Sequence, residues 1–321
     1  MILLLKGKIL NDRYRITQSL GQGGYGAVYL AEDLDSGRMC AIKENLDDSP
    51  DNRTRFLQEA SILYNLHHPN LPEVWDHFVI SGEGQYLVME FVEGLSLIEV
   101  LEHEGKPLPE FKVVNWISQV CDALTYLHSQ NPPIIHRDIK PGNIRISPQG
   151  KAILVDFGIA KVYDEFSRTS TYARAITPGY SPLEQYGLAR TDSRSDVYAL
   201  GATAYKLLTN IQPEPSVDVA AGTAHAPKLA HEVNPKVSRE ASLAIGRAMQ
   251  LKIDQRTASI TQFKHEIMKS PAYRQYHKNK NGQPPPERSF KWVYWLIGIL
   301  LIAGMLAGAY LIYYLLWAYA F

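Results

Sequence analysis

The sequence contains little cysteine and no surplus of charge. Its two cysteines, Cys40 and Cys121, offer neither a disulfide framework nor the spacing of a metal site. We expect both as small core residues in a reducing compartment. Lysine plus arginine equals aspartate plus glutamate at 33 each, so bulk charge gives no attraction to nucleic acid, and no nucleic-acid partner is expected.

The N-terminus lacks the basic start and the long apolar run of a signal peptide. An uncharged stretch appears only at the other end, where the thirty residues 292–321 carry no formal charge. As a helix they would reach about 45 Å, against roughly 30 Å of hydrocarbon in a bilayer. We therefore predict a transmembrane helix at 292–321 in contact with the lipid bilayer; the alternative is a buried core helix. The expected localisation is the cell membrane, with a single pass and no extracellular domain after Phe321.

The preceding segment, residues 271–291, is basic and contains Gly282 and Pro284–Pro286. We predict a stiff, unfolded juxtamembrane linker there. Basic residues beside a span mark the cytoplasmic side, so the bulk of the chain is expected in the cytoplasm; an ordinary solvated linker is the alternative reading of these charges. Within the span, Gly304 and Gly308 have the spacing that lets two helices approach closely. One interpretation is a homodimer through this helix; the alternative is that these are ordinary glycines, which are common in membrane helices.

Three glycines, Gly21, Gly23 and Gly26, have a spacing found in loops that approach phosphates. A dinucleotide site would need a helix to begin at the third glycine. The following "AVYL" and "MCAIK" instead favour strands, with the turn-forming "DLDSG" between them. The pattern predicts a glycine-rich hairpin, which either covers phosphates or is a simple tight turn.

Lys43 lies in the second of these apolar strands, where an ammonium group needs a counter-charge. Glu59 is the natural partner, because "RTRFLQEASILYNLHH" has the apolar periodicity of a helix. An exposed lysine and an unrelated surface glutamate are the alternative.

Four motifs occur in order along the chain: "GQGGYGAV" at 21–28, "AIK" at 41–43, "HRDIKPGN" at 136–143 and "DFG" at 156–158. With them the chain resembles a bacterial eukaryotic-like serine/threonine protein kinase over about Leu10 to Lys269. The resemblance implies an α+β, two-lobed protein kinase fold with a small β-rich N-lobe and a larger helical C-lobe. The expected domains are a kinase domain at 1–270, with its N-lobe at about 10–91 and its C-lobe at about 92–270, followed by the linker at 271–291 and the transmembrane helix at 292–321.

The resemblance also implies transfer of the ATP γ-phosphate to Ser or Thr of protein substrates, with Mg²⁺ as the metal and Mn²⁺ as an alternative. Asp138 would receive the proton of the substrate hydroxyl, Lys140 would meet the γ-phosphate, and Thr177 would support both. The other expected catalytic residues are Lys43 and Glu59.

The resemblance assigns further residues to the nucleotide, the metal and the scaffold. Asn143 and Asp156 would bind the metal. ATP would be held by Gly21, Gly23, Gly26, Val28, Ala41, Lys43, Glu90 and Val92, with Met89 at the back of the pocket. The structural residues would be His136, Arg137, Phe157, Glu184, Asp196 and Arg256, of which Glu184 and Arg256 form a salt bridge.

The chain departs from the family pattern in three places. Ile176-Thr177 stands where a Gly-Thr pair is usual, and "SPLE" stands for Ala-Pro-Glu. Both changes leave peptide specificity open. Arg145 occupies a usually aliphatic position below the adenine; we expect its methylene stem to pack there and its guanidinium to reach water.

The segment between Asp156 and Glu184 is rich in hydroxyl groups. Arg137 would receive a phosphate added there by autophosphorylation, which would activate the protein. The candidate phosphorylation sites are Ser167, Thr169, Ser170 and Thr171. A homodimer through the kinase domain is a further expectation. The alternatives are a catalytically silent kinase-fold scaffold at the membrane and a small-molecule kinase of related fold.

Overall fold

The computed structural model describes residues 3–23, 26–45, 50–156, 176–187 and 191–280. Contacts divide the chain into one unit at 1–274 and another at 275–321, and the fold below is that of the first. Phe157, the four candidate phosphorylation sites and the predicted span at 292–321 lie outside the described residues.

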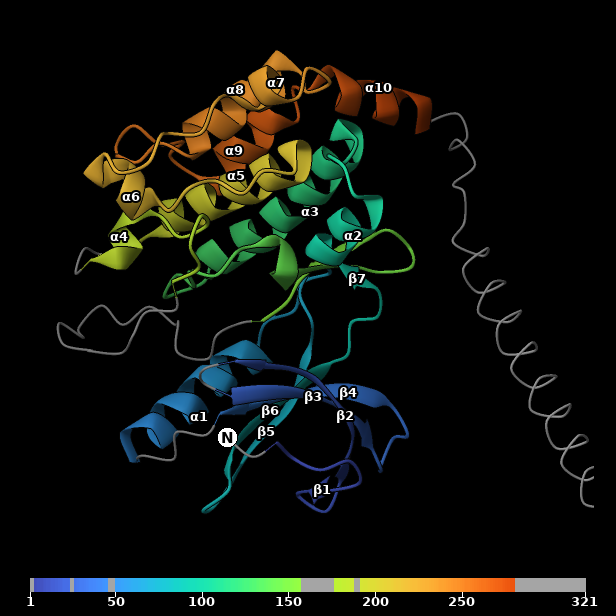
Figure 1. The fold of residues 1–321 in the computed structure, drawn as a ribbon. Helices are drawn as coiled ribbons and strands as arrows, with labels where there is room; N and C mark the ends of the chain where they lie inside the picture. The colour runs from blue at the N-terminus through green and yellow to red at the C-terminus, as the bar shows by residue number, and fades with distance from the viewer. Residues whose placement is uncertain (1–2, 24–25, 46–49, 157–175, 188–190, 281–321) are drawn as a thin grey trace, which may run out of the picture. The chain divides into compact units, whose positions relative to one another are not determined.

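The N-terminal part of this unit is an antiparallel six-stranded sheet in the order β1-β2-β3-β4-β6-β5 (Figure 1). Gly23 of β2 pairs with Gly26 of β3, and β4 follows in the next hairpin. The prediction of a strand, a glycine loop and two further strands is therefore confirmed. The strands are β1 (Ile9–Leu10), β2 (Tyr14–Gly23), β3 (Gly26–Asp33), β4 (Met39–Asn45), β5 (Val74–Ile80) and β6 (Gly84–Glu90).

The two faces of this sheet contribute to different apolar clusters, because side chains alternate along a strand. Ala41 of β4 belongs to the cluster that includes buried residues of helix α1 (Pro50–Tyr64), such as Phe56. Ile42 belongs to the opposite cluster. On that side Glu44 is buried and accepts hydrogen bonds from two tyrosine hydroxyls. The same alternation directs Ala41 and Lys43 to one face of the sheet.

Helices make up most of the second part, in which α3 (Glu110–His128) and α5 (Ser193–Thr209) supply many of the buried residues (Figure 1). A small sheet of β7 (Leu95–Ser96), β8 (Ile144–Ile146) and β9 (Ala152–Leu154) lies beside a 3-10 helix (Pro141–Asn143). The remaining helices are α2 (Leu97–Glu104), α4 (Leu183–Tyr186), α6 (Ser216–Ala221), α7 (Ala230–Val233), α8 (Arg239–Ala248), α9 (Ile260–Ile267) and α10 (Pro271–Lys280).

The two parts together make the two-lobed fold that the sequence predicted. The connection from β6 to β7 joins the lobes, and a side chain joins them as well. Asn70 lies in the loop after α1. Its side-chain amide donates to the Ala152 carbonyl at 2.7 Å, and its backbone carbonyl accepts from the Leu154 N–H at 2.9 Å. The loop between α1 and β5 is thereby bonded to β9 of the helical lobe.

Both cysteines are fully buried in the core, as predicted. Burial raises the pKa of Cys40 to about 12 and raises the pKa of Cys121 as well. Neither thiol is therefore ionised at neutral pH.

The C-terminal part differs from the prediction in one stretch. Residues 271–280, expected as unfolded linker, form α10. Ser270 precedes the helix and accepts from the Tyr273 N–H at 3.2 Å, while Pro271 takes the first helical position, where its missing N–H costs nothing. Within the described residues no helix is both long enough and apolar enough to cross a membrane.

A buried ion pair connects α4 to the loop before α9. Arg256, whose side chain is completely buried, donates from its two terminal nitrogens to the Glu184 carboxylate at 2.7 and 3.2 Å. It also donates to the carbonyls of Arg194 and Gln250, and Glu184 accepts from the Ser195 hydroxyl. The charges of both groups are thus met inside the protein, as a buried pair requires.

We predict that Arg256→Met lowers the free energy of unfolding by about 3–5 kcal/mol, because Glu184 then stays buried without its cation. Arg247→Met is the control, since it breaks a half-exposed pair with Glu266 and costs at most about 1 kcal/mol. Urea unfolding followed by circular dichroism measures both variants. Equal losses in the two variants would contradict the prediction.

Candidate active site

The loop that follows α3 carries two of the expected catalytic residues, Asp138 and Lys140, and a buried carboxylate holds this loop in place. Asp196, in the first turn of α5, accepts from the backbone N–H groups of His136 and Arg137 at 2.9 and 2.8 Å. His128, at the end of α3, contacts the same carboxylate at 2.8 Å. Burial alone would raise the pKa of Asp196, but the hydrogen bond with His128 and the positive charge around it lower that pKa overall. The anchor is therefore a carboxylate ion.

Asp138 is the centre of a dense group of hydrogen bonds. Its carboxylate accepts from the Thr177 hydroxyl at 2.8 Å, from the Lys140 ammonium at 3.1 and 3.3 Å, and from the Asn143 amide at 2.9 Å. Lys140 also lies 3.4 Å from the Thr177 hydroxyl. Four of the predicted site residues, from the catalytic loop and from the segment before α4, thus meet at one carboxylate.

The opposite wall of the site comes from the sheet of the N-lobe. Lys43 on β4 forms an ion pair with Asp156, which follows β9. This contact joins the two lobes across the site. Glu59 lies in α1, but its side chain is outside the described part, so its pairing with Lys43 stays a prediction.

The donor set fits a divalent metal such as Mg²⁺. Asn143 directs its amide nitrogen to Asp138, which leaves the amide oxygen as the atom that can bind a cation. Asp156 supplies a carboxylate, and the Val155 N–H donates to the Asn143 carbonyl at 2.8 Å, which fixes the two segments together. No group of three His, Cys, Asp or Glu able to hold a metal occurs among the described residues. A metal here would complete its shell with phosphate and water oxygens, as Mg²⁺ does.

The residues expected around the adenine base line the connection between the lobes. Ala41 on β4 is opposite Met89 on β6, and both are buried. Val28 on β3 is opposite Lys43. Glu90 ends β6, and Val92 is buried in the segment that leads to β7. The strand register therefore places Ala41 beside Met89 and Val28 beside Lys43, while Glu90 and Val92 border the connection between the lobes.

Arg145 differs from its prediction. Its guanidinium was expected in water, but Nε donates to the Val92 carbonyl at 3.0 Å and a terminal nitrogen donates to the Gly94 carbonyl. Its position on β8, which pairs with β7, brings the side chain to backbone acceptors, although the residue as a whole stays partly exposed.

Sequence reasoning missed two supports of the catalytic loop. His128 contacts Asp196, and Gln185 donates to the Arg137 carbonyl at 2.8 Å. Each partner lies 48 or more residues away along the chain. Nothing in the local sequence marks such a contact.

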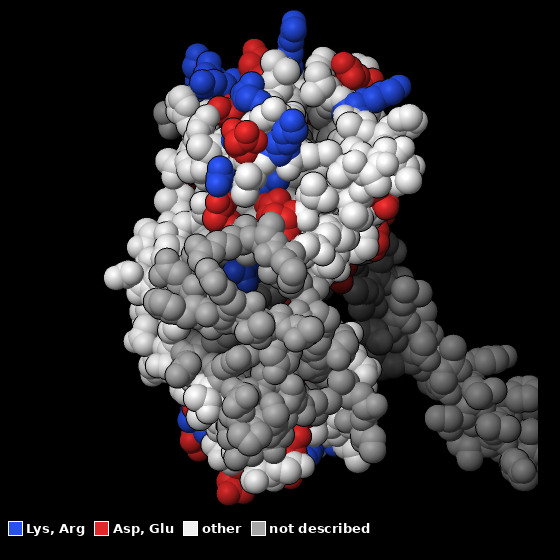
Figure 2. Space-filling model, turned by 90° about the vertical axis from the view of Figure 1, so that its left-hand side faces the viewer, with Lys and Arg blue, Asp and Glu red and all other residues white. Residues whose placement is uncertain are grey.

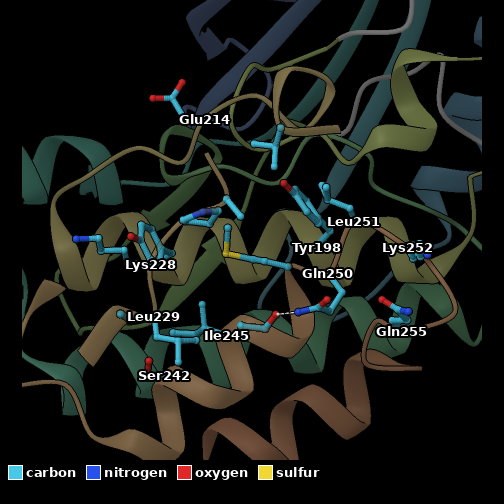
Figure 3. A pocket seen from close by; sticks show the side chains of 17 residues that line it. Tyr198, Glu214, Lys228, Leu229, Ser242, Ile245, Gln250, Leu251, Lys252 and Gln255 are labelled. Carbon is cyan, nitrogen blue, oxygen red and sulfur yellow. Dashed lines mark hydrogen bonds between the residues drawn. The ribbon is translucent and has the colours of Figure 1, made fainter. Parts of the chain in front are cut away.

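A separate cavity of about 350 Å³ lies in the helical lobe and is lined from α5, α6, α7, α8 and the adjoining loops (Figure 3). Its lining includes the apolar side chains of Ile245 and Met249, the ring of Tyr198 and the charged residues Lys228 and Glu214. None of its lining residues belongs to the group around Asp138. Over the described part of the face in Figure 2, positive and negative side chains are interspersed and form no field of one sign.

Comparison with known proteins agrees with this geometry. The protein kinase domain model matches residues 14–269. The probable serine/threonine-protein kinase PknB of Lactococcus lactis is 36% identical over 211 residues, covering 64% of this chain and 33% of that protein. Serine/threonine-protein kinase C of Synechocystis sp. is 38% identical over 223 residues, covering 64% of this chain and 41% of that protein. The matches thus span well under half the length of these relatives.

Among solved structures, the kinase domain of Mycobacterium tuberculosis PknI superposes with a TM-score of 0.66 at 25% identity. The match covers 83% of this chain and 98% of that domain. Fold, site geometry and family model agree. The chain therefore belongs to the protein kinase family, with residues 14–269 as its protein kinase domain.

Proposed function

We propose that the protein is a membrane-anchored serine/threonine kinase that transfers the γ-phosphate of ATP to Ser or Thr of protein substrates, with Mg²⁺ as its metal. The observation that carries this proposal is the contact of Asp138 with both Lys140 and Thr177. This contact brings together the carboxylate of Asp138 as a hydrogen-bond acceptor, the ammonium group of Lys140 and the hydroxyl of Thr177. The names of the relatives, both serine/threonine kinases, support the same substrate class.

Asp138 is placed to orient the attacking hydroxyl. In the transfer, the substrate oxygen forms a bond to the γ-phosphorus, the bond from that phosphorus to the bridging oxygen of ADP breaks, and Asp138 accepts the hydroxyl proton. Lys140 holds the carboxylate in position and brings a positive charge to the phosphate that is transferred. Thr177 fixes one carboxylate oxygen by its hydrogen bond.

The other charged residues of the site, Lys43 and Asp156, would face the phosphates of a nucleotide from the side opposite Asp138. Lys43 and Asp156 meet between the lobes, so a bound nucleotide would bring its α- and β-phosphates to Lys43 and its metal to Asp156 and Asn143. Bound Mg²⁺ would neutralise part of the charge that develops on the phosphate oxygens. Because these groups are already ordered by hydrogen bonds, little reorganisation is needed at the moment of transfer.

The membrane anchor rests on the sequence of residues 292–321. Thirty residues without a formal charge exceed the length needed to span a bilayer. The basic residues of 271–291 favour a cytoplasmic kinase domain. The small-residue spacing of Gly304 and Gly308 supports association of two such helices, which would bring two kinase domains together for phosphorylation in trans.

Autophosphorylation in the segment before Thr177 forms the regulatory part of the proposal. Arg137 has a backbone fixed on both sides, by its N–H on Asp196 and by its carbonyl on Gln185. A phosphate near its guanidinium would therefore be tied to a rigid point of the catalytic loop. Ser167, Thr169, Ser170 and Thr171 remain the candidate acceptors.

We predict that Asp138→Asn lowers phosphoryl transfer by about 10²- to 10⁴-fold and retains ATP binding, because the amide cannot take the proton. Labelled ATP with Mg²⁺ and phosphoamino-acid analysis measure the transfer, and label is expected on Ser or Thr. Asp122→Asn, a carboxylate on α3 that pairs with Lys264 at the surface, is the control and stays active. If the parent binds ATP and transfers no phosphate, the silent scaffold replaces this proposal.

Replacing Ser167, Thr169, Ser170 and Thr171 together by Ala is predicted to lower activity roughly 10-fold, since a charge-assisted contact with Arg137 is lost. Arg137→Gln should give a similar loss, and combining the two changes should add little, because both remove one interaction. Steady-state rates after preincubation with ATP, together with phosphosite mapping, check this. Full activity in the quadruple Ala variant contradicts it.

We predict that the full chain sediments with membranes and resists extraction by alkaline carbonate, because the apolar span is held in the bilayer. A chain ending at residue 280 should remain in the supernatant and keep its kinase activity. Ultracentrifugation and immunoblotting of the fractions provide the measurement. Release of the full chain by carbonate would indicate peripheral attachment and would remove the anchor from the proposal.

A further inference from the structure

Glu44 is a buried acidic residue on β4, directly after Lys43 in the sequence. Because side chains alternate along a strand, Glu44 lies on the face of the sheet opposite Lys43, where the apolar cluster that contains Ile42 is found. Only 2% of its surface is exposed. A carboxylate removed from water is unfavourable unless hydrogen-bond donors meet it. The stability of this position therefore depends on the partners of Glu44.

Two tyrosine hydroxyls supply the donors, one from each strand beside β4. Tyr29 on β3 donates to one oxygen of the Glu44 carboxylate at 2.8 Å, and Tyr86 on β6 donates to the other oxygen at 3.2 Å. Tyr86 is directly opposite Glu44 in the strand register. Tyr29 is opposite Ile42 and therefore reaches the carboxylate diagonally. One buried carboxylate thus bonds three adjacent strands across one face of the sheet.

The N-terminal segment completes this group of hydrogen bonds. The Leu4 N–H donates to the Tyr29 hydroxyl at 3.2 Å, so this hydroxyl both accepts and donates. Leu3 and Leu4 also pack against the apolar cluster that contains both tyrosine rings. Burial raises the pKa of Tyr29 to about 12, and burial and the charge of Glu44 raise the pKa of Tyr86. Both hydroxyls therefore remain protonated donors at neutral pH.

The strands that bond to Glu44 on one face also flank Lys43 on the other. Lys43 is opposite Val28 on β3 and Leu87 on β6. Lys43 and Glu44 share one planar peptide bond, so a shift or a rotation of β4 moves both side chains together. The Lys43 ammonium group has to reach Asp156, with which it forms an ion pair. The bonds that fix the carboxylate therefore fix the direction of the ammonium group as well.

We propose that Glu44 is a positioning residue for phosphate binding: with Tyr29 and Tyr86 it holds β4 in place, so that Lys43 is directed at the phosphates of the nucleotide. The inference rests on the proposed function, in which Lys43 meets the α- and β-phosphates of ATP. Glu44 faces away from the site and acts only through its neighbour. Its loss should therefore weaken the contribution of the phosphates to binding and leave that of the nucleoside unchanged.

ADP and adenosine separate these two contributions, because adenosine has the same base and ribose and no phosphate. Glu44→Leu removes both acceptor oxygens and leaves two buried hydroxyls without an acceptor. It should weaken ADP binding about 10-fold and change adenosine binding by less than about 2-fold. Glu44→Gln keeps one acceptor oxygen and should lie between the parent and Glu44→Leu. Tyr29→Phe and Tyr86→Phe each remove one donor and should weaken ADP binding about 3-fold.

The test is isothermal titration calorimetry of the full chain in detergent with ADP and with adenosine, in the presence of Mg²⁺. Tyr14→Phe is the matched control. Tyr14 is as deeply buried as Tyr29, and its hydroxyl donates to the Asp76 carboxylate at 2.8 Å, but these two residues lie on β2 and β5. The control thus removes a similar hydrogen bond that does not involve β4, and it should leave both affinities unchanged.

Steady-state kinetics provide a second measurement. Contacts with the α- and β-phosphates are made both in the ground state and in the transition state, so their loss raises KM more than it lowers kcat. In Glu44→Leu the KM for ATP should therefore rise about as much as the dissociation constant of ADP. A loss of folded protein would instead lower the apparent kcat and leave KM unchanged.

The comparison of ADP with adenosine decides between positioning and a general structural role. Equal weakening of both ligands in Glu44→Leu overturns the inference, and so does ADP binding as tight as that of the parent. Should Glu44→Leu fail to fold, Tyr29→Phe and Tyr86→Phe decide by the same comparison. A parent that binds ADP no more tightly than adenosine contradicts the role of Lys43 in the proposed function. A parent whose gain from the phosphates persists in Glu44→Leu contradicts only the role of Glu44.

Discussion

The site depends on one buried charge, the carboxylate of Asp196. A carboxylate removed from water is stable only when donors surround it. Here two backbone N–H groups and His128 do so, and the position in the first turn of α5 adds the favourable field of a helix N-terminus. The donors that satisfy this charge are the backbone of the catalytic loop. The requirement to pair a buried carboxylate and the requirement to fix Asp138 are thus met by the same bonds.

Two residues on either side of the site have a left-handed backbone that side chains rarely adopt. Arg137 has φ 64° and Asp156 has φ 63°, conformations that cost a non-glycine residue about 1–2 kcal/mol each. At Arg137 the strain is held by hydrogen bonds on both its N–H and its carbonyl. At Asp156 the preceding residue is bonded to Asn143. The surrounding contacts therefore stabilise both residues in these geometries, and Asn143 links the two segments, since it bonds to the Asp138 carboxylate and to the Val155 N–H.

The sequence was sufficient to predict those parts of the fold and the site that depend on interactions between residues close together in the chain. The apolar strands around Gly23 and Gly26 predicted the hairpin, and the catalytic loop was found by its short motif. Contacts set by tertiary structure were out of reach, since His128 meets a partner 68 positions away. The partners of the Arg145 guanidinium could not be predicted from the sequence either. Its flexible stem can reach water or a backbone carbonyl equally well, and every residue carries a carbonyl. Helix α10 is different: Ser270 followed by Pro271 is a recognisable helix start, which the basic, proline-containing context obscured.

The connections between the two lobes differ in whether a bound nucleotide would change them. The lobes are connected by the chain at 91–94, by the amide of Asn70 and by the Lys43–Asp156 pair across the site. Phosphates that enter between Lys43 and Asp156 would compete for the lysine, so this third connection is exchanged for contacts with the nucleotide. The connection at 91–94 cannot be exchanged in the same way, because Arg145 and Gly94 attach it to β8 independently of any ligand. The base would therefore meet a segment ordered in advance, which reduces the entropy lost on binding, while the phosphate end of the site adapts.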